Sequence, residues 1–363
     1  MLRAVELFCV RMPLALPFRT ATSHTVVKDA LLVRVETDDG AGWGECVAQV
    51  ASTYLPDTIE SSRLALRDHL VPRAFAGAPF ADVRGHAPAR FALECALLDA
   101  RLRADGVSLA RHLGATRADV PAGVAIGMVE GDDELRGLVT HYVEQGYGRI
   151  KVKVEPGAAL NIARTARASA GDAVELALDA NGSYEADDAD ELHALDDLGL
   201  QCIEQPFAAD ALVAHARLAK RLRTPVCLDE TITSASVARD AIAVKACDIV
   251  SVKAGRLGSF AETRAVHDAG MASGVPALAG GMLETGIGRA ALLAVAALPG
   301  FTATGDCSGS ARYFGPDRDL TEDFVVRDGQ LRVPDAPGLG VAVRPEQLAR
   351  YTIARERMTA KDG

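Results

Sequence analysis

Two lysines interrupt an apolar segment of the chain, RIKVKVEPG at residues 149–157. Ile150 and Val152 are β-branched, as is typical of a buried strand, but Lys151 and Lys153 alternate with them. Because successive side chains of a strand point to opposite faces, the two ammonium groups share one face. Such a strand directs two amines at one place, so their role depends on what the neighbouring strands bring there.

Charged residues recur at the ends of the apolar segments that follow. The series runs Lys153, Asp179, Glu204, Asp229 and Lys253, at intervals of 26, 25, 25 and 24 residues. Each interval is about one strand–helix repeat. Side chains at the same phase of successive repeats lie at the same depth in a barrel, and barrel enzymes carry their active sites at the carboxyl ends of the strands. We therefore expect these five side chains to converge at one mouth.

Three converging carboxylates require a cation, because buried like charges cannot all stay ionised alone. Oxygen ligands on neighbouring strands suit Mg²⁺, which prefers octahedral oxygen coordination with places left for water or substrate. Zinc fits less well, since no histidine or cysteine keeps the phase of the series. A simpler interpretation is that each acid caps the helix that follows it. For a single residue this interpretation and a shared site are equally favoured, but five charged residues in phase favour the shared site.

The lysines would flank that cation, Lys151 and Lys153 from one side and Lys253 from the other. A lysine that is desolvated and close to other cations has a lowered pKa, so we expect a base near neutral pH. Proton abstraction beside a carboxylate generates an enediolate dianion, which a divalent cation and an ammonium group stabilise. The pattern predicts proton transfer at the α-carbon of a carboxylic acid.

The elements that would position these residues alternate along the chain from about residue 120. Alanine-rich amphipathic segments separate most of the short apolar runs, which predicts a parallel sheet covered by helices. Eight such units favour closure into a (β/α)7β barrel, a modified TIM barrel of the α/β class. The predicted strands are 124–129, 150–154, 174–180, 200–206, 225–231, 247–255, 275–281 and 301–306.

The region before residue 118 has a different, α+β pattern. We expect a strand at 4–13, an antiparallel hairpin of 30–37 and 42–47 around Asp38-Asp39-Gly40, and helices near 57–70 and 86–104. A second Asp-Gly turn, in 324–334, predicts a hairpin that returns to this region. The predicted organisation is a capping domain at 1–118, completed by about 325–363, and a barrel domain at 119–324.

Composition excludes several classes of function. The net charge of −10 over 363 residues argues against a nucleic-acid surface. With no apolar run long enough to span a bilayer and no recognisable signal peptide, we expect neither a membrane span nor secretion. The seven cysteines are scattered without a CxxC pair, which indicates reduced thiols and a cytoplasmic protein.

Several motifs, taken together, resemble the enolase superfamily, muconate-lactonising subgroup. They cover most of the chain: KVKVEPG, LALDANGSY, CIEQPF, PVCLDETI, VKAGR, GGMLETGIGR and PGLGV. GGMLETGIGR and the KxGR of VKAGR are similar to the o-succinylbenzoate synthase and N-succinylamino acid racemase family. The resemblance implies the barrel with its N-terminal cap, and an Mg²⁺-dependent enzyme, with Mn²⁺ as the alternative ion.

The resemblance also implies roles for the residues of the series. Asp179, Glu204 and Asp229 match the metal ligands. Lys153 matches the second lysine of the family's KxK motif, an acid/base, and Lys253 matches the opposed lysine. In a synthase, Lys153 would remove the α-proton and help water leave while the other lysine stabilises the enediolate. In a racemase, both lysines would exchange protons on opposite faces of the α-carbon.

Further residues are implied to bind substrate. Lys151 and Asn181 would position the substrate carboxylate and metal-bound waters, and the backbone at Gly281 and Met282 would lie near a succinyl arm. Arg256 would either tune Lys253 by charge repulsion, a feature associated with racemase activity in the family, or form a structural ion pair; the two roles are evenly balanced.

The function implied is o-succinylbenzoate synthase, a lyase that dehydrates 2-succinyl-6-hydroxy-2,4-cyclohexadiene-1-carboxylate, with N-succinylamino acid racemase activity besides. A dedicated N-acylamino acid racemase is the alternative. A dipeptide epimerase is disfavoured because GDCSGS, at 305–310, offers only Asp306 where that class has Asp-x-Asp. A barrel that merely binds a carboxylate ligand is a third hypothesis. We expect a homo-oligomer, a dimer or octamer, in menaquinone synthesis.

Two segments and three substitutions bear on the substrate. The segments 17–27 and 47–57 would be specificity loops of the cap. The family more often has Ser where Ala125 stands, and Asn and Pro where Ser251 and Ala254 stand. These departures leave the chemistry intact and put the substrate in question.

Overall fold

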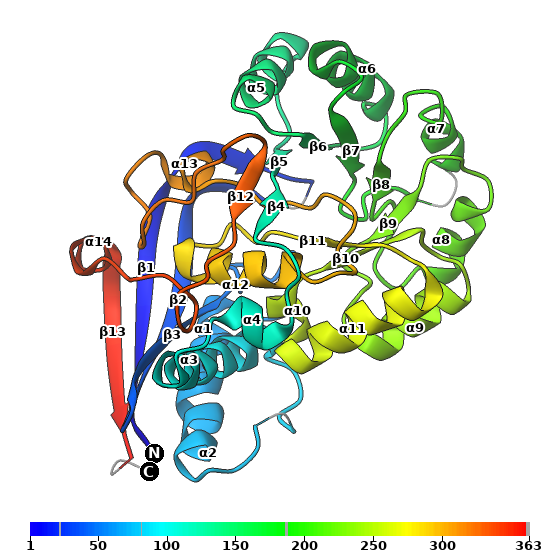
Figure 1. Cartoon of the computed structure of the whole chain (residues 1–363). Coiled ribbons are helices and arrows are strands. Elements are labelled where there is room, and N and C mark those ends of the chain that lie inside the picture. The colour runs from blue at the N-terminus through cyan, green and yellow to red at the C-terminus, as the bar shows by residue number, and fades with distance from the viewer. Residues whose placement is uncertain (22, 81, 186–187, 361–363) are drawn as a thin grey trace.

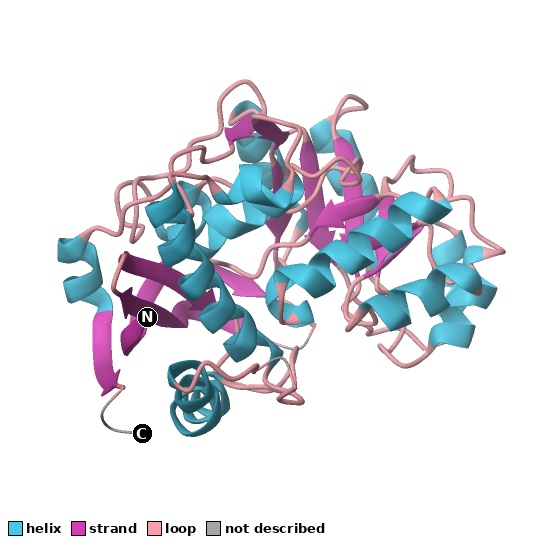
Figure 2. Ribbon diagram, turned by 60° about the horizontal axis from the view of Figure 1, so that its bottom comes forward, coloured by secondary structure: helices cyan, strands magenta, loops and turns pink. Residues whose placement is uncertain are grey.

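The computed structural model describes residues 1–21, 23–80, 82–185 and 188–360. Its centre is a curled sheet of parallel strands in the order β11-β10-β9-β8-β7-β6-β5, with helices on its outer face (Figures 1 and 2). The strands are β5 (Gly123–Ile126), β6 (Arg149–Lys153), β7 (Glu175–Asp179), β8 (Cys202–Glu204), β9 (Val226–Leu228), β10 (Ile249–Val252) and β11 (Ala277–Ala279).

The helices of the barrel follow their strands and bury one alanine-rich face. Helix α6 buries Ala159, Ala163, Ala166 and Ala170, a helical spacing that places them on one side. The others are α5 (Asp132–Glu144), α7 (Ala189–His193), α8 (Leu212–Ala219), α9 (Ala235–Ala243), α10 (Ala254–Leu257), α11 (Phe260–Ser273), α12 (Gly286–Ala296) and α13 (Ser310–Phe314).

The prediction of a regular eighth strand at 301–306 was wrong. The segment still closes the barrel, because Ala303 and Asp306 donate to carbonyls of β11 and Gly123 of β5 donates to the carbonyl of the residue after the segment. Close backbone approach explains the irregularity. A Cβ on Gly305 would lie 2.3 Å from a carbonyl oxygen of β11, so only glycine fits there.

The N-terminal region forms an antiparallel sheet in the order β13-β1-β2-β3, and Figure 1 shows β13 beside β1. Its strands are β1 (Leu2–Arg19), β2 (His24–Thr37), β3 (Gly40–Cys46) and β13 (Thr352–Thr359). The pairing of β2 with β3 confirms the predicted hairpin. Helix α3 (Ala87–Asp105) packs directly on β3, since a Cβ on Gly42 or Gly44 would lie about 2 Å from a helix carbonyl.

The remaining elements are short. They are α1 (Ile59–Ala65), the π-helical turn η1 (Leu66–Leu70), α2 (Val71–Phe75), α4 (Leu109–Leu113), β4 (Asp119–Pro121), β12 (Gln330–Arg332) and α14 (Pro345–Tyr351). The predicted hairpin at 324–334 turns at Arg327 and Gln330 but pairs through β12 with β4, at the entry to the barrel. The return to the N-terminal sheet is made later, by β13. The division into capping and barrel domains stays a prediction.

Two further expectations were the absence of a membrane span and the presence of reduced thiols. No helix within the described ranges is long and apolar enough to cross a bilayer. All seven cysteines, which are described, carry free thiols.

Candidate active site

Strand register aligns the charged series. Lys153, Asp179 and Glu204 are direct partners across β6, β7 and β8. Asp229 lies two residues beyond the β9 partner of Glu204, and therefore on the same face. Lys253 directly follows β10. The structure thus brings the five predicted residues to one end of the barrel, with the three carboxylates fully buried.

Each carboxylate of this group binds cationic side chains. Lys153 Nζ lies 2.5 Å from Asp179 Oδ2, and Lys253 Nζ lies 2.7 Å from Asp229 Oδ2. Lys151 Nζ contacts both Glu204 oxygens at 3.0 Å and Asp179 Oδ2 at 3.1 Å. These are short contacts between buried opposite charges, so each charge stabilises its partner against desolvation.

No three His, Cys, Asp or Glu side chains in the described ranges surround a common point closely enough to hold a metal ion. The predicted ligands turn their oxygens to lysines instead of to one another. The chemistry of the donor set nevertheless fits a hard divalent cation, because Asp179, Glu204 and Asp229 offer carboxylates from three adjacent strands. Oε2 of Glu230, next to Asp229, is buried and accepts no hydrogen bond from any described residue. An orphaned carboxylate oxygen of this kind is a further place for positive charge.

The protonation of these acids reflects how well each is paired. Burial and the neighbouring Asp179, Asp306 and Asp229 raise the pKa of Glu204 to about 7, although Lys151 opposes them. Burial and Asp229 raise the pKa of Glu230 to about 8. Burial would raise the pKa of Asp229 too, but the adjoining guanidinium and ammonium groups hold it well below its usual value. Negative charge is therefore compensated unevenly across the cluster.

The expectation of a lowered lysine pKa was wrong for two lysines in this arrangement. Burial lowers the pKa of Lys253, but Asp229 raises it further, and the net change is well upward. The same holds for Lys151 beside Asp306, Glu204 and Asp179. The physical reason is that the nearest charges are carboxylates rather than other cations.

The other predicted substrate residues surround the same mouth. Asn181 accepts from Lys153 Nζ at 2.7 Å and donates to Glu230 at 2.7 Å. Arg256 forms the ion pair that was one of its two predicted roles, with Nη1 2.5 Å from Asp229 Oδ1. Gly281 and Met282 line a cavity of about 70 Å³ together with the lysines. Its lining is Phe18, Thr20, Ser23, Thr25, Gln49, Tyr54, Ala125, Lys151, Lys153, Asn181, Lys253, Gly281, Met282, Leu283, Asp306 and Tyr313.

Three residues of this cluster were missed from the sequence. Arg149 is fully buried, with Nη1 2.5 Å from Asp306 Oδ1, and Asp306 binds Lys151 Nζ at 2.6 Å. The signal for Arg149 was present, because it has the same strand phase as Lys151 and Lys153. Tyr54 has no such signal. Its hydroxyl lies 2.6 Å from Lys253 Nζ, 2.8 Å from Asp229 Oδ2 and 2.8 Å from Arg256 Nη1.

The predicted specificity loops differ from each other. The described part of the segment 17–27 is largely strand, since β1 and β2 pair as far as Arg19 and His24; residue 22 lies outside the described residues. The segment 47–57 is irregular and delivers Tyr54 to the lysine. Of the three departures, Ala125 lines the cavity, and the Ser251 side chain is buried beside Lys253.

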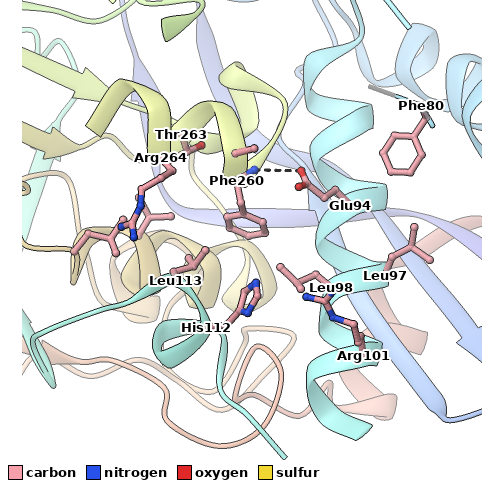
Figure 3. Close-up of a pocket in the computed structure, with 13 residues that line it drawn as sticks. Phe80, Glu94, Leu97, Leu98, Arg101, His112, Leu113, Phe260, Thr263 and Arg264 are labelled. Atoms are coloured by element: carbon pink, nitrogen blue, oxygen red, sulfur yellow. Dashed lines mark hydrogen bonds between the residues drawn. The ribbon is translucent and has the colours of Figure 1, made fainter. Parts of the chain in front are cut away.

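A roomier hollow of about 570 Å³ lies elsewhere, between α3, α4, α11 and α12 (Figure 3). Its walls are largely apolar, including Leu97, Leu98 and Phe260, and Glu94 accepts from the Phe260 N–H at 3.2 Å. None of the predicted site residues lines it. Because the ionisable groups suited to proton transfer meet at the barrel mouth, the smaller cavity is the candidate active site.

Known proteins provide an independent comparison. Residues 134–347 match a family model described as "Enolase C-terminal domain-like". An N-succinylamino acid racemase of Amycolatopsis sp. is 44% identical over 98% of both chains, and an o-succinylbenzoate synthase of Geobacillus kaustophilus is 41% identical over 94% of both. A crystal structure of an enolase superfamily member from Listeria innocua superposes with a TM-score of 0.92 at 31% identity, covering 99% of both chains.

Proposed function

Since the chain belongs to the enolase superfamily, in the family of o-succinylbenzoate synthases and N-succinylamino acid racemases, we propose that it is an o-succinylbenzoate synthase that also racemises N-succinylamino acids. The observation that carries the proposal is the pair of amines, Lys153 from β6 and Lys253 from the end of β10, which line one cavity. Two amines reaching one cavity from well-separated strands can serve two faces of one carbon.

The residues of the chain divide the work as follows. In dehydration, Lys153 removes the α-proton of the cyclohexadiene carboxylate and returns it to the departing hydroxyl on the same face, which gives syn elimination. Lys253 remains an ammonium group and stabilises the enediolate. In racemisation, one lysine removes the α-proton and the other delivers a proton to the opposite face. Lys151 also pairs with Asp306, which is outside the proposed ligand set, and so stays cationic and binds the substrate carboxylate.

The proposed cofactor is Mg²⁺, with Mn²⁺ as the alternative. Asp179, Glu204 and Asp229 would hold it, and when bound it would supply positive charge for the enediolate. The same carboxylates now pair with Lys153, Lys151 and Lys253. The base roles therefore require these acids to bind another cation and release the amines.

The decisive experiment offers the purified protein both substrates with Mg²⁺. We expect measurable kcat/KM for the cyclohexadiene substrate and for an N-succinylamino acid. Turnover of neither would contradict the assignment, as would a failure to exchange the substrate α-proton with deuterium, which the ligand-binding hypothesis predicts. A small-molecule carboxylate is the proposed partner, and a homo-oligomer the proposed assembly.

A dedicated N-succinylamino acid racemase is the second candidate. It is favoured by the Amycolatopsis relative of that name and by the position of Arg256. Its guanidinium donates to the same Tyr54 hydroxyl as Lys253 and to the other carboxylate oxygen of Asp229. Racemisation without dehydration in the same experiment would select this candidate.

A further inference from the structure

The wall of the cavity formed by Gly281, Met282 and Leu283 belongs to the segment between β11 and α12. Leu283 has φ +58°, a left-handed conformation that a branched side chain rarely adopts. A strained residue of this kind persists only where its surroundings hold it in place. The contacts that hold this wall therefore determine the shape of the cavity.

One contact is a buried carboxylate from the N-terminal sheet. Glu45 of β3 is 1% exposed, and its Oε2 accepts from Thr285 N at 3.0 Å, Thr285 Oγ1 at 2.6 Å and Gly288 N at 3.0 Å. These groups form the first turn of α12, every residue of which is buried. A carboxylate at this position satisfies the free N–H groups of the helix and interacts favourably with its dipole.

The fit at this turn is specific. A Cβ on Gly288 would lie 2.8 Å from Glu45 Oε2, so the glycine leaves the space that the carboxylate occupies. The same helix has a second cap that does not come from the sheet. Asp319 Oδ1 accepts from Gly286 N at 2.7 Å. Two carboxylates, Glu45 and Asp319, therefore cap the start of this helix, and of the two only Glu45 belongs to β3.

The second contact is a buried ammonium group from the same sheet. Lys28 of β2 is 4% exposed and donates to the Met282 carbonyl at 3.3 Å. Its charge also acts on Glu45, where it opposes the upward effect of burial on the pKa of that acid. Lys28 thus contacts the wall itself, at Met282, and Glu45 holds the start of the helix that directly follows it, at Thr285.

We propose that Lys28 and Glu45 are positioning residues of the substrate pocket, through which the N-terminal sheet sets the wall at 281–283 against the acyl arm of the substrate. The inference rests on the proposed function, because the acyl arm belongs to the substrate proposed there. The reacting carbon must lie between Lys153 and Lys253. Leu283 also borders a hollow lined by residues of β2 and of the 49–53 segment, so the Leu283 end of the wall extends from the lysines toward the N-terminal sheet.

The test compares N-succinyl and N-acetyl derivatives of one amino acid, because only the first carries the long arm. For Glu45→Gln and Lys28→Met we expect KM for the N-succinyl substrate to rise about tenfold or more, the effect of a lost charged hydrogen bond, with kcat little changed. The kcat/KM for the N-acetyl substrate should change by no more than about twofold. Lys28→Arg, which keeps the charge, should stay close to wild type.

Asp319→Asn is the matched control. It weakens a cap of the same helix without touching 281–283, so it should lower the Tm and leave the ratio of the two substrates unchanged. If Glu45→Gln does not fold, Lys28→Met alone decides. Parallel losses with both substrates, or a fall in kcat at constant KM, would overturn the inference while leaving the proposed function standing. A wild-type protein inactive on both substrates would contradict the proposed function and, with it, the inference.

Discussion

Among single residues, Lys153 and Lys253 differ in their partners. Lys153 Nζ donates to Asp179 and to the neutral amide of Asn181. Lys253 Nζ lies between Asp229 and the Tyr54 hydroxyl, and 4.7 Å from the centre of the Tyr54 ring. A cation held by an anion, a hydroxyl and an aromatic face is well stabilised as an ammonium group. This difference supports a permanent cationic role for Lys253 in dehydration.

Replacing Lys153 by alanine should abolish both reactions. Each needs a proton moved on that face, and general acid–base groups contribute roughly 10²- to 10⁴-fold to rate. Steady-state assays with both substrates measure the loss, and circular dichroism checks that the variant is folded. Retention of either activity within about tenfold of wild type would rule out Lys153 as the shared base.

The substitution Lys253→Arg should separate the reactions. An arginine keeps the positive charge beside the enediolate but does not deprotonate, so racemisation should be lost while some dehydration remains. Parallel assays of the two activities test this expectation. An equal loss of both would count against the divided roles.

The site was predictable from the sequence where strand phase determines position. Lys153, Asp179 and Glu204 lie side by side because parallel strands in register bring equivalent residues to equal depth. Tyr54 was not predictable, since the irregular segment around it carries no periodicity that fixes the direction of a side chain. The pairing of lysines with carboxylates also depends on distances that spacing along the chain does not contain.

Among elements, the alternation of strands and helices was predictable because short, mostly apolar runs alternate with alanine-rich amphipathic segments. The exceptions have local causes. The run 301–306 contains Gly305, whose close contact with β11 replaces a regular ladder. The extension of β1 to Arg19 was hidden because Pro13 and Pro17 lack N–H groups, and the pairing with β2 shifts between Pro13 and Phe18.

The contact of α3 with α11 predicts a pH-dependent stability. Burial raises the pKa of Glu94 from 4.5 to about 6. An acid whose pKa is raised on folding contributes stability below pH 4.5, and this contribution is lost as the pH rises through about 6. Replacing Glu94 by glutamine, which can still accept from Phe260 N–H (Figure 3), should stabilise the protein at pH 8 by about 2 kcal/mol and little at pH 4.

Urea unfolding of both proteins at the two pH values measures this difference. Catalytic activity should be unaffected, because Glu94 lies in the hollow outside the candidate active site. The same stability gain at both pH values would show that ionisation of Glu94 is not its cause.

In the whole molecule, the N-terminal region completes the site that the barrel begins. Tyr54 reaches the lysine, and Phe18, from β1, lines the cavity. The cavity of about 70 Å³ is far smaller than the roughly 300 Å³ or more of typical small-molecule sites. Side chains of both regions therefore fill most of the space that a substrate would take, the lysines of the barrel among them.

The charges gathered between the two regions predict how the whole fold responds to magnesium. Asp179, Glu204 and Asp229 are fully buried, and Glu204 has a raised pKa because its negative charge is poorly compensated. An ion that binds the folded protein alone stabilises it by about 2.7 kcal/mol at a hundred times its Kd, which raises the Tm by several degrees. We therefore expect Mg²⁺ to raise the Tm, measured by calorimetry against a sodium salt of equal ionic strength.

Glu204→Gln is the matched variant for this measurement. Its pKa of about 7 means that the native carboxyl is already partly protonated, so the amide disturbs the metal-free fold less than a change at Asp229, which two cations hold ionised. The variant should have a Tm close to wild type without Mg²⁺ and should lose most of the increase with it. An equal increase in both proteins would mean that magnesium binds elsewhere, and the three strand-end carboxylates would not be its site.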